Sequence, residues 1–292
     1  MTSRFSERVN NSRRAFLRAR RKSVPVRILI PNMVTLLGLC VGLTSIRMAI
    51  EGRFEYALIA IAAAAVLDGL DGRMARLLKA SSRFGAELDS LSDFVCFGVA
   101  PAVVLFLWGF QDARSLGWII VLVFVVAAAL RLARFNVALD DPAKPIWENS
   151  FFVGVPVPAG AILLMLPLYL EGLGVPKDWM LMPLLAVYAL VIAGLMPSRV
   201  RTFSGKLIGR RIEREFVAPV VALAVVFAAT LVTYPYLSVT LACLTYLAMI
   251  PMSARRYEEL VREYKTVDTR AIAHENGSEP EKAHTSAHQD GP

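Results

Sequence analysis

The sequence predicts an all-α fold, a polytopic membrane bundle of about eight transmembrane helices. Hydrophobic residues make up 56% of the 292 residues and the mean hydropathy is +0.52. A soluble domain of this size has an apolar share of about 45–50%. The apolar residues also stand in long runs, of about the 20 residues that a helix needs to cross a bilayer. Both observations predict a membrane protein with soluble ends.

The basic residues divide the expected loops into two sets. Of the 32 lysines and arginines, 28 lie in five segments and only four lie elsewhere. These segments are residues 1–27, 73–83, 131–144, 199–214 and the chain after residue 252. Because basic loops stay on the cytoplasmic side of a membrane, the five segments and both termini are expected to be cytoplasmic. Topology thus explains the net charge of +8, and no nucleic-acid partner is expected.

The spans are expected in a regular order along the chain. The basic segment 1–27 precedes them, either as an interfacial helix or as a solvated flank. Spans follow at about 28–50, 54–77, 86–110, 115–138, a fifth beginning in SFFVGVPVPAGAILL, 179–196, 216–234 and 236–252. The last two are alternatively one re-entrant unit, because a very short turn joins them. Residues 253–292 have a composition that predicts a mostly disordered cytoplasmic tail.

Four aspartates stand in an apolar region between residues 66 and 98. Asp68 and Asp71 are spaced i, i+3, and Asp89 and Asp93 are spaced i, i+4, so each pair shares one helix face. The polar, basic sequence RLLKASSR between the pairs predicts a turn at the membrane surface. We therefore expect a helical hairpin with two carboxylate pairs facing each other just inside the bilayer.

This arrangement is costly unless cations compensate the charges. An aspartate deep in a membrane helix costs about 2.5–3.5 kcal/mol, so four cost on the order of 10 kcal/mol, and their repulsion adds to this. Oxygen ligands favour Mg²⁺ or Mn²⁺, and two such ions bridged by carboxylates are a known device for phosphoryl chemistry. All three histidines lie in the polar tail, so any general base in the spans must be a carboxylate.

The acids belong to a longer pattern, Asp68-x-x-Asp71-Gly72-x-x-Ala75-Arg76, eight residues, Gly85-x-x-x-Asp89-x-x-x-Asp93. It resembles the signature of the CDP-alcohol phosphotransferase family at every fixed position. The resemblance covers about residues 28–200, a six-helix core to which 201–252 would add a cytoplasmic loop and two spans. It implies a membrane enzyme that transfers a substituted phosphate from a CDP-linked donor to an alcohol, releasing CMP. A homodimer and two divalent ions are also implied.

The resemblance implies a role for each acid. Asp68, Asp71 and Asp89 would be the principal metal ligands. Asp93 would be the general base that removes the proton from the acceptor hydroxyl, and would also touch a metal.

Five further residues are implied to bind the CDP moiety. They are Asn32, Thr35, Gly72, Arg76 and Gly85. The two glycines remove side chains where a diphosphate must come near the backbone. On spacing alone, Asn32 and Thr35 are equally well explained as helix-packing residues, as are Gly38-x-x-x-Gly42 in the same span.

Three other segments indicate the subgroup. LRLARFN, FVGVPVPAGA and SRVRTFSGK resemble bacterial family members that use L-serine as the acceptor and CDP-diacylglycerol as the donor, in the cell membrane; a leucine is common where Val155 stands. Choline, glycerol 3-phosphate and inositol phosphate are alternative acceptors. A cation-translocating protein would distribute its acids across the bilayer, whereas these lie at one depth. A non-catalytic binding protein would not need the intact motif.

The acceptor carboxylate needs a fixed cation. Arg131 and Arg134 are spaced i, i+3 at the cytoplasmic edge of their span, and Asn136 follows with an amide. We expect these three residues to bind serine or phosphate. Lipid anchoring by snorkelling arginines is the alternative.

Overall fold

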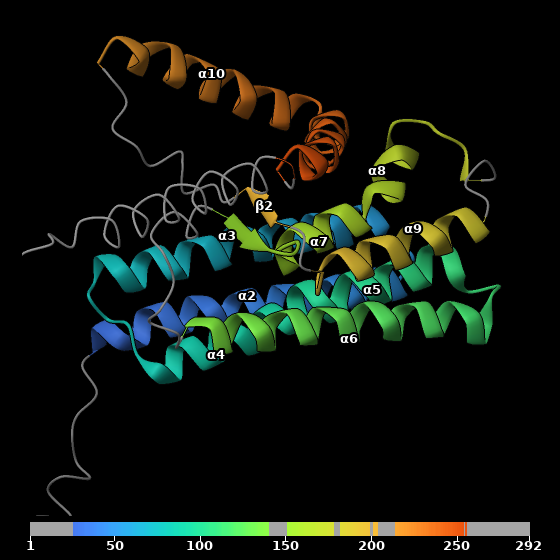
Figure 1. Cartoon of the computed structure of the whole chain (residues 1–292), viewed down its shortest axis with the longest axis horizontal. Helices are drawn as coiled ribbons and strands as arrows, with labels where there is room; N and C mark the ends of the chain where they lie inside the picture. Colours follow the sequence, from blue (N-terminus) through green and yellow to red (C-terminus); the bar gives the residue numbers. More distant parts are fainter. Residues whose placement is uncertain are drawn as a thin grey trace, which may run out of the picture.

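The protein is described from a computed structural model, which covers residues 26–139, 151–177, 182–198, 201–203, 214–253 and 255. Its first helices are α2 (Val26–Ile50), α3 (Phe54–Leu77), a continuous rod over Arg83–Phe110, and α6 (Arg114–Leu139). They lie side by side along the long axis of the molecule (Figure 1). The expected N-terminal segment and the expected tail fall almost wholly outside the described residues.

The second half of the chain adds shorter helices. These are α7 (Val157–Leu164), α8 (Leu166–Gly172), α9 (Met182–Leu195), α10 (Arg214–Thr233) and a last helix, Pro235–Ser253. Helices therefore occur in each range expected for a span. The expected fifth span is divided at Met165, just before Pro167, whose ring nitrogen has no hydrogen to donate to the helix ladder.

The protein is a membrane protein by the length and composition of its helices. Within the described ranges, four helices are long and apolar enough to cross a bilayer: Arg27–Ile50, Arg83–Phe110, Ser115–Ala138 and Pro235–Ser253. Helix α3 is long, but its C-terminal part carries the acids and arginines of the motif. The number eight for the spans remains a prediction.

The rod over Arg83–Phe110 is not a regular α-helix. It contains α4 (Arg83–Asp93), a π-helical turn η1 (Phe94–Val99), α5 (Ala100–Leu105) and a second π-helical turn η2 (Phe106–Phe110). Pro101 gives a reason for the first: without an N–H it cannot bond the carbonyl four residues earlier, and the ladder widens locally. The turn begins directly after Asp93, so it fixes how the acid-bearing end is rotated relative to α5.

A short pair of strands departs from the all-α expectation. Strand β1 (Phe151–Val153) pairs antiparallel with β2 (Arg201–Phe203), and the rest of the described chain is helical or in turns. Gly154 ends β1 with a φ of 74°, and a Cβ at this position would lie 2.1 Å from the Met196 carbonyl oxygen. The glycine thus lets β1 approach the end of α9.

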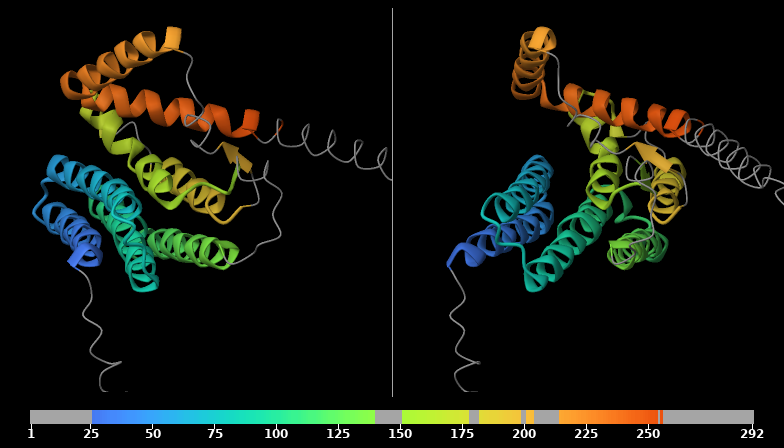
Figure 2. Two further views of the ribbon diagram at one scale, coloured as in Figure 1. Left: turned by 90° about the vertical axis from the view of Figure 1, so that its left-hand side faces the viewer. Right: turned by 60° about the vertical axis from the view of Figure 1, so that its left-hand side comes forward.

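The last helix lies across the bundle instead of along it. It is seen nearly end-on in Figure 1, where the bundle helices lie across the view, and lengthwise in the left panel of Figure 2. The Cys243 thiol is 3.8 Å from the Ile162 carbonyl oxygen of α7, and the Tyr236 ring lies against Gly172. Both helices expected at 216–234 and 236–252 are present, and whether they are two spans or one re-entrant unit stays a prediction.

Helix α2 holds the acid-bearing rod at very close range. A Cβ on Gly42 would stand 2.4 Å from Cys96 Sγ, whereas a Cβ on Gly38 would meet its nearest neighbour, Leu67 Cβ, at 3.5 Å. The Cys96 thiol in turn donates to the Gly38 carbonyl at 3.5 Å. Only one glycine of the Gly38-x-x-x-Gly42 pair is therefore required by packing.

Gly42→Ala is expected to lower the thermal stability of the purified protein, because overpacking costs about 1–3 kcal/mol. Gly38→Ala is the matched control, and it should be neutral or stabilising because alanine gains about 1 kcal/mol of helix propensity without a clash. Adding Cys96→Ala to Gly42→Ala should restore part of the loss. Thermal unfolding in detergent measures all three, and equal effects at the two glycines would contradict this packing.

Candidate active site

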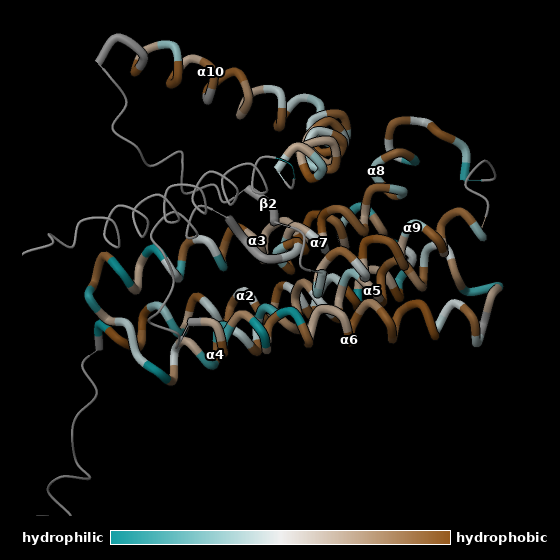
Figure 3. Tube along the Cα trace, in the orientation of Figure 1, coloured by the Kyte–Doolittle hydropathy of each residue, from teal (hydrophilic) through white to brown (hydrophobic). Residues whose placement is uncertain are grey.

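The four aspartates meet at one end of the bundle. The start of α2, the end of α3 and the start of α4 lie together there, and polar residues gather at this end (Figures 1 and 3). The expected turn between the acid pairs is confirmed, since α3 ends at Leu77 and α4 begins at Arg83. Ser82 caps α4 by accepting a hydrogen bond of 3.0 Å from the Gly85 N–H.

Three of the acids are close enough to share a metal ion. Asp68, Asp71 and Asp89 each offer a carboxylate oxygen, and these oxygens all lie within 4.8 Å of one another. Oxygens on opposite sides of an octahedral Mg²⁺ stand about 4.2 Å apart, because each bond is about 2.1 Å. The helices therefore bring together ligands of the type and spacing that a hard divalent cation needs.

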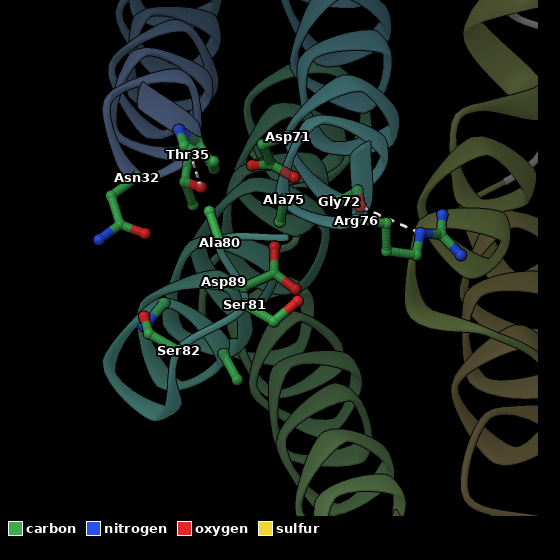
Figure 4. Close-up of a pocket in the computed structure, with 13 residues that line it drawn as sticks. Asn32, Thr35, Asp71, Gly72, Ala75, Arg76, Ala80, Ser81, Ser82 and Asp89 are labelled. Carbon is green, nitrogen blue, oxygen red and sulfur yellow. Dashed lines mark hydrogen bonds between the residues drawn. The ribbon is translucent and has the colours of Figure 1, made fainter. Parts of the chain in front are cut away.

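Asp71 has a buried carboxylate oxygen that a bound cation could satisfy. Its side chain is 4% exposed, and its Oδ2 atom is buried with no hydrogen-bond partner. The Thr35 hydroxyl lies beside the carboxyl (Figure 4). The ion pairs found among the described residues join Glu51 to Arg47 and Arg53, away from the four acids. A buried acceptor without a partner costs about 1–3 kcal/mol, which a metal ligand bond would remove. The residues fit a divalent cation.

Asp93 lies one step from the three-acid cluster. It lies close to Asp68, and it follows Asp89 by one helical turn on α4. It is thus placed beside the three-acid cluster rather than within it.

A pocket opens beside the carboxylates between α2, α3 and α4. Asp71, Asp89, Asn32 and Gly72 are among the residues that line it (Figure 4). A Cβ on Gly72 would meet no atom within 4 Å, so this glycine leaves open space. A Cβ on Gly85 would stand 2.9 Å from Asn32 Oδ1, so that glycine lets the Asn32 side chain lie against α4. The two motif glycines act differently.

Arg76 also lines the pocket, but its guanidinium points away from the carboxylates (Figure 4). Its Nε donates to the Gly72 carbonyl at 3.1 Å and its side chain is exposed. All five residues expected to bind CDP, namely Asn32, Thr35, Gly72, Arg76 and Gly85, line this pocket.

The three residues expected at the acceptor site lie on α6, outside that pocket lining. Arg131 is buried at 7% exposed and its Nε has no hydrogen-bond partner. Arg134 is exposed and donates to the Pro197 carbonyl. Asn136 donates from Nδ2 to Ser90 Oγ at 3.1 Å, so its amide contacts α4.

Ala80, Ser81 and Ser82 also line the pocket, and none of them was predicted as a site residue from the sequence. A serine directly before a predicted helix is a typical N-cap, and this would have indicated Ser82. The close contact of α2 with the N-terminal turn of α4 has no comparable local pattern.

The chain belongs to the CDP-alcohol phosphatidyltransferase family, because residues 28–196 match the family model of that description. This family depends on divalent metals, in agreement with the acidic cluster. Residues 215–251 match a second model, described as CDP-alcohol phosphatidyltransferase 2.

The chain is also similar to family members that are named for one particular reaction. The chain is 42% identical over 237 residues to the CDP-diacylglycerol–serine O-phosphatidyltransferase of Mycobacterium leprae, a match covering 80% of this chain and 76% of the relative. It is 36% identical over 253 residues to the protein of the same name from Mycobacterium bovis, covering 85% of both. A third, from Methanocaldococcus jannaschii, is 40% identical over 138 residues, covering 47% of this chain and 59% of the relative.

Asp71→Asn should abolish the thermal stabilisation that Mn²⁺ gives to the purified protein. An ion present at 100 times its dissociation constant stabilises a protein by about 2.7 kcal/mol. In EDTA the variant should be at least as stable as the wild type, because one of several repelling charges is gone. Glu87→Gln, an exposed acid on the same helix as Asp89, is the control and should keep the shift. A full Mn²⁺ shift in Asp71→Asn would remove this residue from the ligand set.

Proposed function

We propose that the protein transfers the phosphatidyl group of CDP-diacylglycerol to L-serine and releases CMP. The observation that carries this proposal is the 42% identity, over 80% of the chain, to a protein named for that reaction. The pocket beside the acids agrees with it, because every residue expected to bind CDP lines that pocket.

The proposal includes a location in a bacterial cell membrane, with both termini and the active site on the cytoplasmic side. The distribution of basic residues supports this orientation, since the segments beside the acids are rich in lysine and arginine. Eight spans and a homodimer complete the proposal. A site at the membrane edge suits the reaction, because the acyl chains of the donor stay in lipid while serine and CMP exchange with water.

Asp68, Asp71 and Asp89 would hold two Mg²⁺ or Mn²⁺ ions, with Asp93 beside them. When bound, such ions neutralise the donor diphosphate and make its phosphorus more electrophilic. The unpartnered Oδ2 of Asp71 supports this assignment.

Asp93 is proposed as the general base. Its carboxylate takes the proton of the serine hydroxyl while the serine oxygen forms a bond to the phosphatidyl phosphorus. The bond from that phosphorus to the bridging oxygen of CDP breaks, and CMP leaves with the electron pair. The position of Asp93 supports this role, because it lies one helical turn from Asp89, next to the three-acid cluster but not part of it.

The nucleotide is proposed to lie between α2 and the α3–α4 turn. Gly72 leaves room for the diphosphate, and Gly85 lets Asn32 approach from α2, where Thr35 also lines the pocket. Arg76 would turn from the Gly72 carbonyl toward the nucleotide, because its side chain is exposed and free to rotate.

The carboxylate of serine is proposed to bind the arginines of α6. Arg131 has a buried Nε that no described residue satisfies, which is the condition in which an anion binds most strongly. Arg134 lies one turn further along the same helix.

The direct test is to offer the purified protein CDP-diacylglycerol with serine, choline, glycerol 3-phosphate and inositol phosphate in separate reactions. Phosphatidylserine and CMP should form in equal amounts, and only in the presence of Mg²⁺ or Mn²⁺. Preference for any other alcohol would overturn the proposed acceptor while leaving the family unchanged.

Gly72→Ala should weaken donor binding and leave the fold intact. A methyl group would enter open pocket space, so the KM for CDP-diacylglycerol should rise by about tenfold or more, equivalent to about 1.4 kcal/mol. Gly69→Ala is matched to it, since that glycine is on the same helix, is also exposed, and also has no atom within 4 Å of an added Cβ. Both variants should be equally stable, and equal kinetic effects would show that helix propensity, not the pocket, is responsible.

Arg131→Lys and Arg134→Lys should each raise the KM for serine by at least about tenfold, because a charged hydrogen bond contributes about 1.5–3 kcal/mol. Lysine cannot reproduce the two-pronged contact of a guanidinium with a carboxylate. The KM for CDP-diacylglycerol should change far less. Arg47→Lys is the control, since Arg47 pairs with Glu51 at the C-terminal end of α2, away from the pocket. Normal serine kinetics in both α6 variants would identify the arginines as lipid anchors.

A further inference from the structure

A pair of hydrogen-bonding side chains joins α6 to α4 beside the acids. Asn136 donates from Nδ2 to Ser90 Oγ at 3.1 Å, and the Ser90 hydroxyl is 3.1 Å from the Ala86 carbonyl oxygen one turn earlier on α4. A second approach, from Ser90 Oγ to Asn136 Oδ1, is longer at 3.4 Å. The shortest arrangement is therefore a chain in which the amide donates to the hydroxyl and the hydroxyl donates to the backbone.

The position of Ser90 makes this link relevant to the metal ligands. Ser90 directly follows Asp89 and precedes Asp93 by three residues, so it lies on the flank of the helix face that carries both acids. On the α2 side, Ser92 Oγ is 3.4 Å from the Thr35 carbonyl oxygen. The rotation of α4 about its axis is thus held from two directions, by α2 and by α6.

From the sequence, Asn136 is expected to contact serine or phosphate. In the structure its amide nitrogen is already bonded to Ser90, and Asn136 does not belong to the lining of the pocket beside Asp71 and Asp89. Its partner Ser90 is also absent from that lining. Both residues are half-buried, as expected for a contact between helices.

We propose that Asn136 is a positioning residue, which acts through Ser90 to hold Asp89 and Asp93 in the geometry that binds metal and accepts the serine proton. This rests on the proposed function for its kinetic part. The link also connects the helix of Arg131 and Arg134, where serine is proposed to bind, with the helix that carries the proposed base. The position of α6 would therefore influence the positions of Asp89 and Asp93.

The test compares Ser90→Ala, Asn136→Ala and the double variant in the purified full-length protein. Each is measured for kcat, for the KM of serine, and for Mn²⁺ affinity by electron paramagnetic resonance of the free ion. Each single substitution should lower kcat and weaken Mn²⁺ binding by about two- to tenfold, the range of one neutral hydrogen bond, with the KM of serine nearly unchanged. The double variant should be no worse than either single variant. Ser90→Thr, which keeps the hydroxyl, should restore values near those of the wild type.

Any of three outcomes would overturn the inference. Asn136→Ala could raise the KM of serine while Ser90→Ala behaves as wild type, which would place the amide on the substrate. Alternatively, Mn²⁺ affinity and kcat could be unaffected by both substitutions, or the two effects could multiply in the double variant. A wild type that prefers another acceptor would refute the proposed function alone, because the Mn²⁺ measurement does not involve an acceptor.

Discussion

The repulsion among four carboxylates at one end of the bundle is the constraint on which this structure depends. Oxygens of Asp68, Asp71 and Asp89 lie within 4.8 Å of one another, and Asp93 adjoins them. No described basic side chain forms an ion pair with them. Such a cluster is costly, and both the packing of the helices and bound cations would lower this cost. The close contact at Gly42, the capped start of α4 and the α6 link can each be understood as holding it.

The sequence was sufficient to predict the helical bundle, the hairpin and the grouping of the acids. Apolar runs and i, i+3 or i, i+4 spacings are local patterns, and local patterns determine which residues share a helix face. The expected CDP residues also line one pocket. Spacing could not show that Gly72 and Gly85 have different roles. Gly72 faces open space and Gly85 faces Asn32, and this difference depends on the position of the neighbouring helix α2.

Other features depend on contacts between distant segments and could not be predicted. The pairing of β1 with β2 places Gly154 against the residue that follows α9, and the last helix contacts α7 through Cys243. The bond from Asn136 to Ser90 joins residues 46 positions apart that belong to no shared motif. The sequence therefore allowed only the expectation that Asn136 binds substrate. Its contact with α4 could be found only from the structure.

The account is tested most directly by locating Mn²⁺ in the protein by anomalous X-ray scattering. Crystals grown with Mn²⁺ should show anomalous peaks bound by Asp68, Asp71 and Asp89, with Asp93 next to them, and the buried Oδ2 of Asp71 should be a ligand. Peaks confined to other surfaces, in a preparation that is fully active, would contradict the claim that divalent ions hold these carboxylates together.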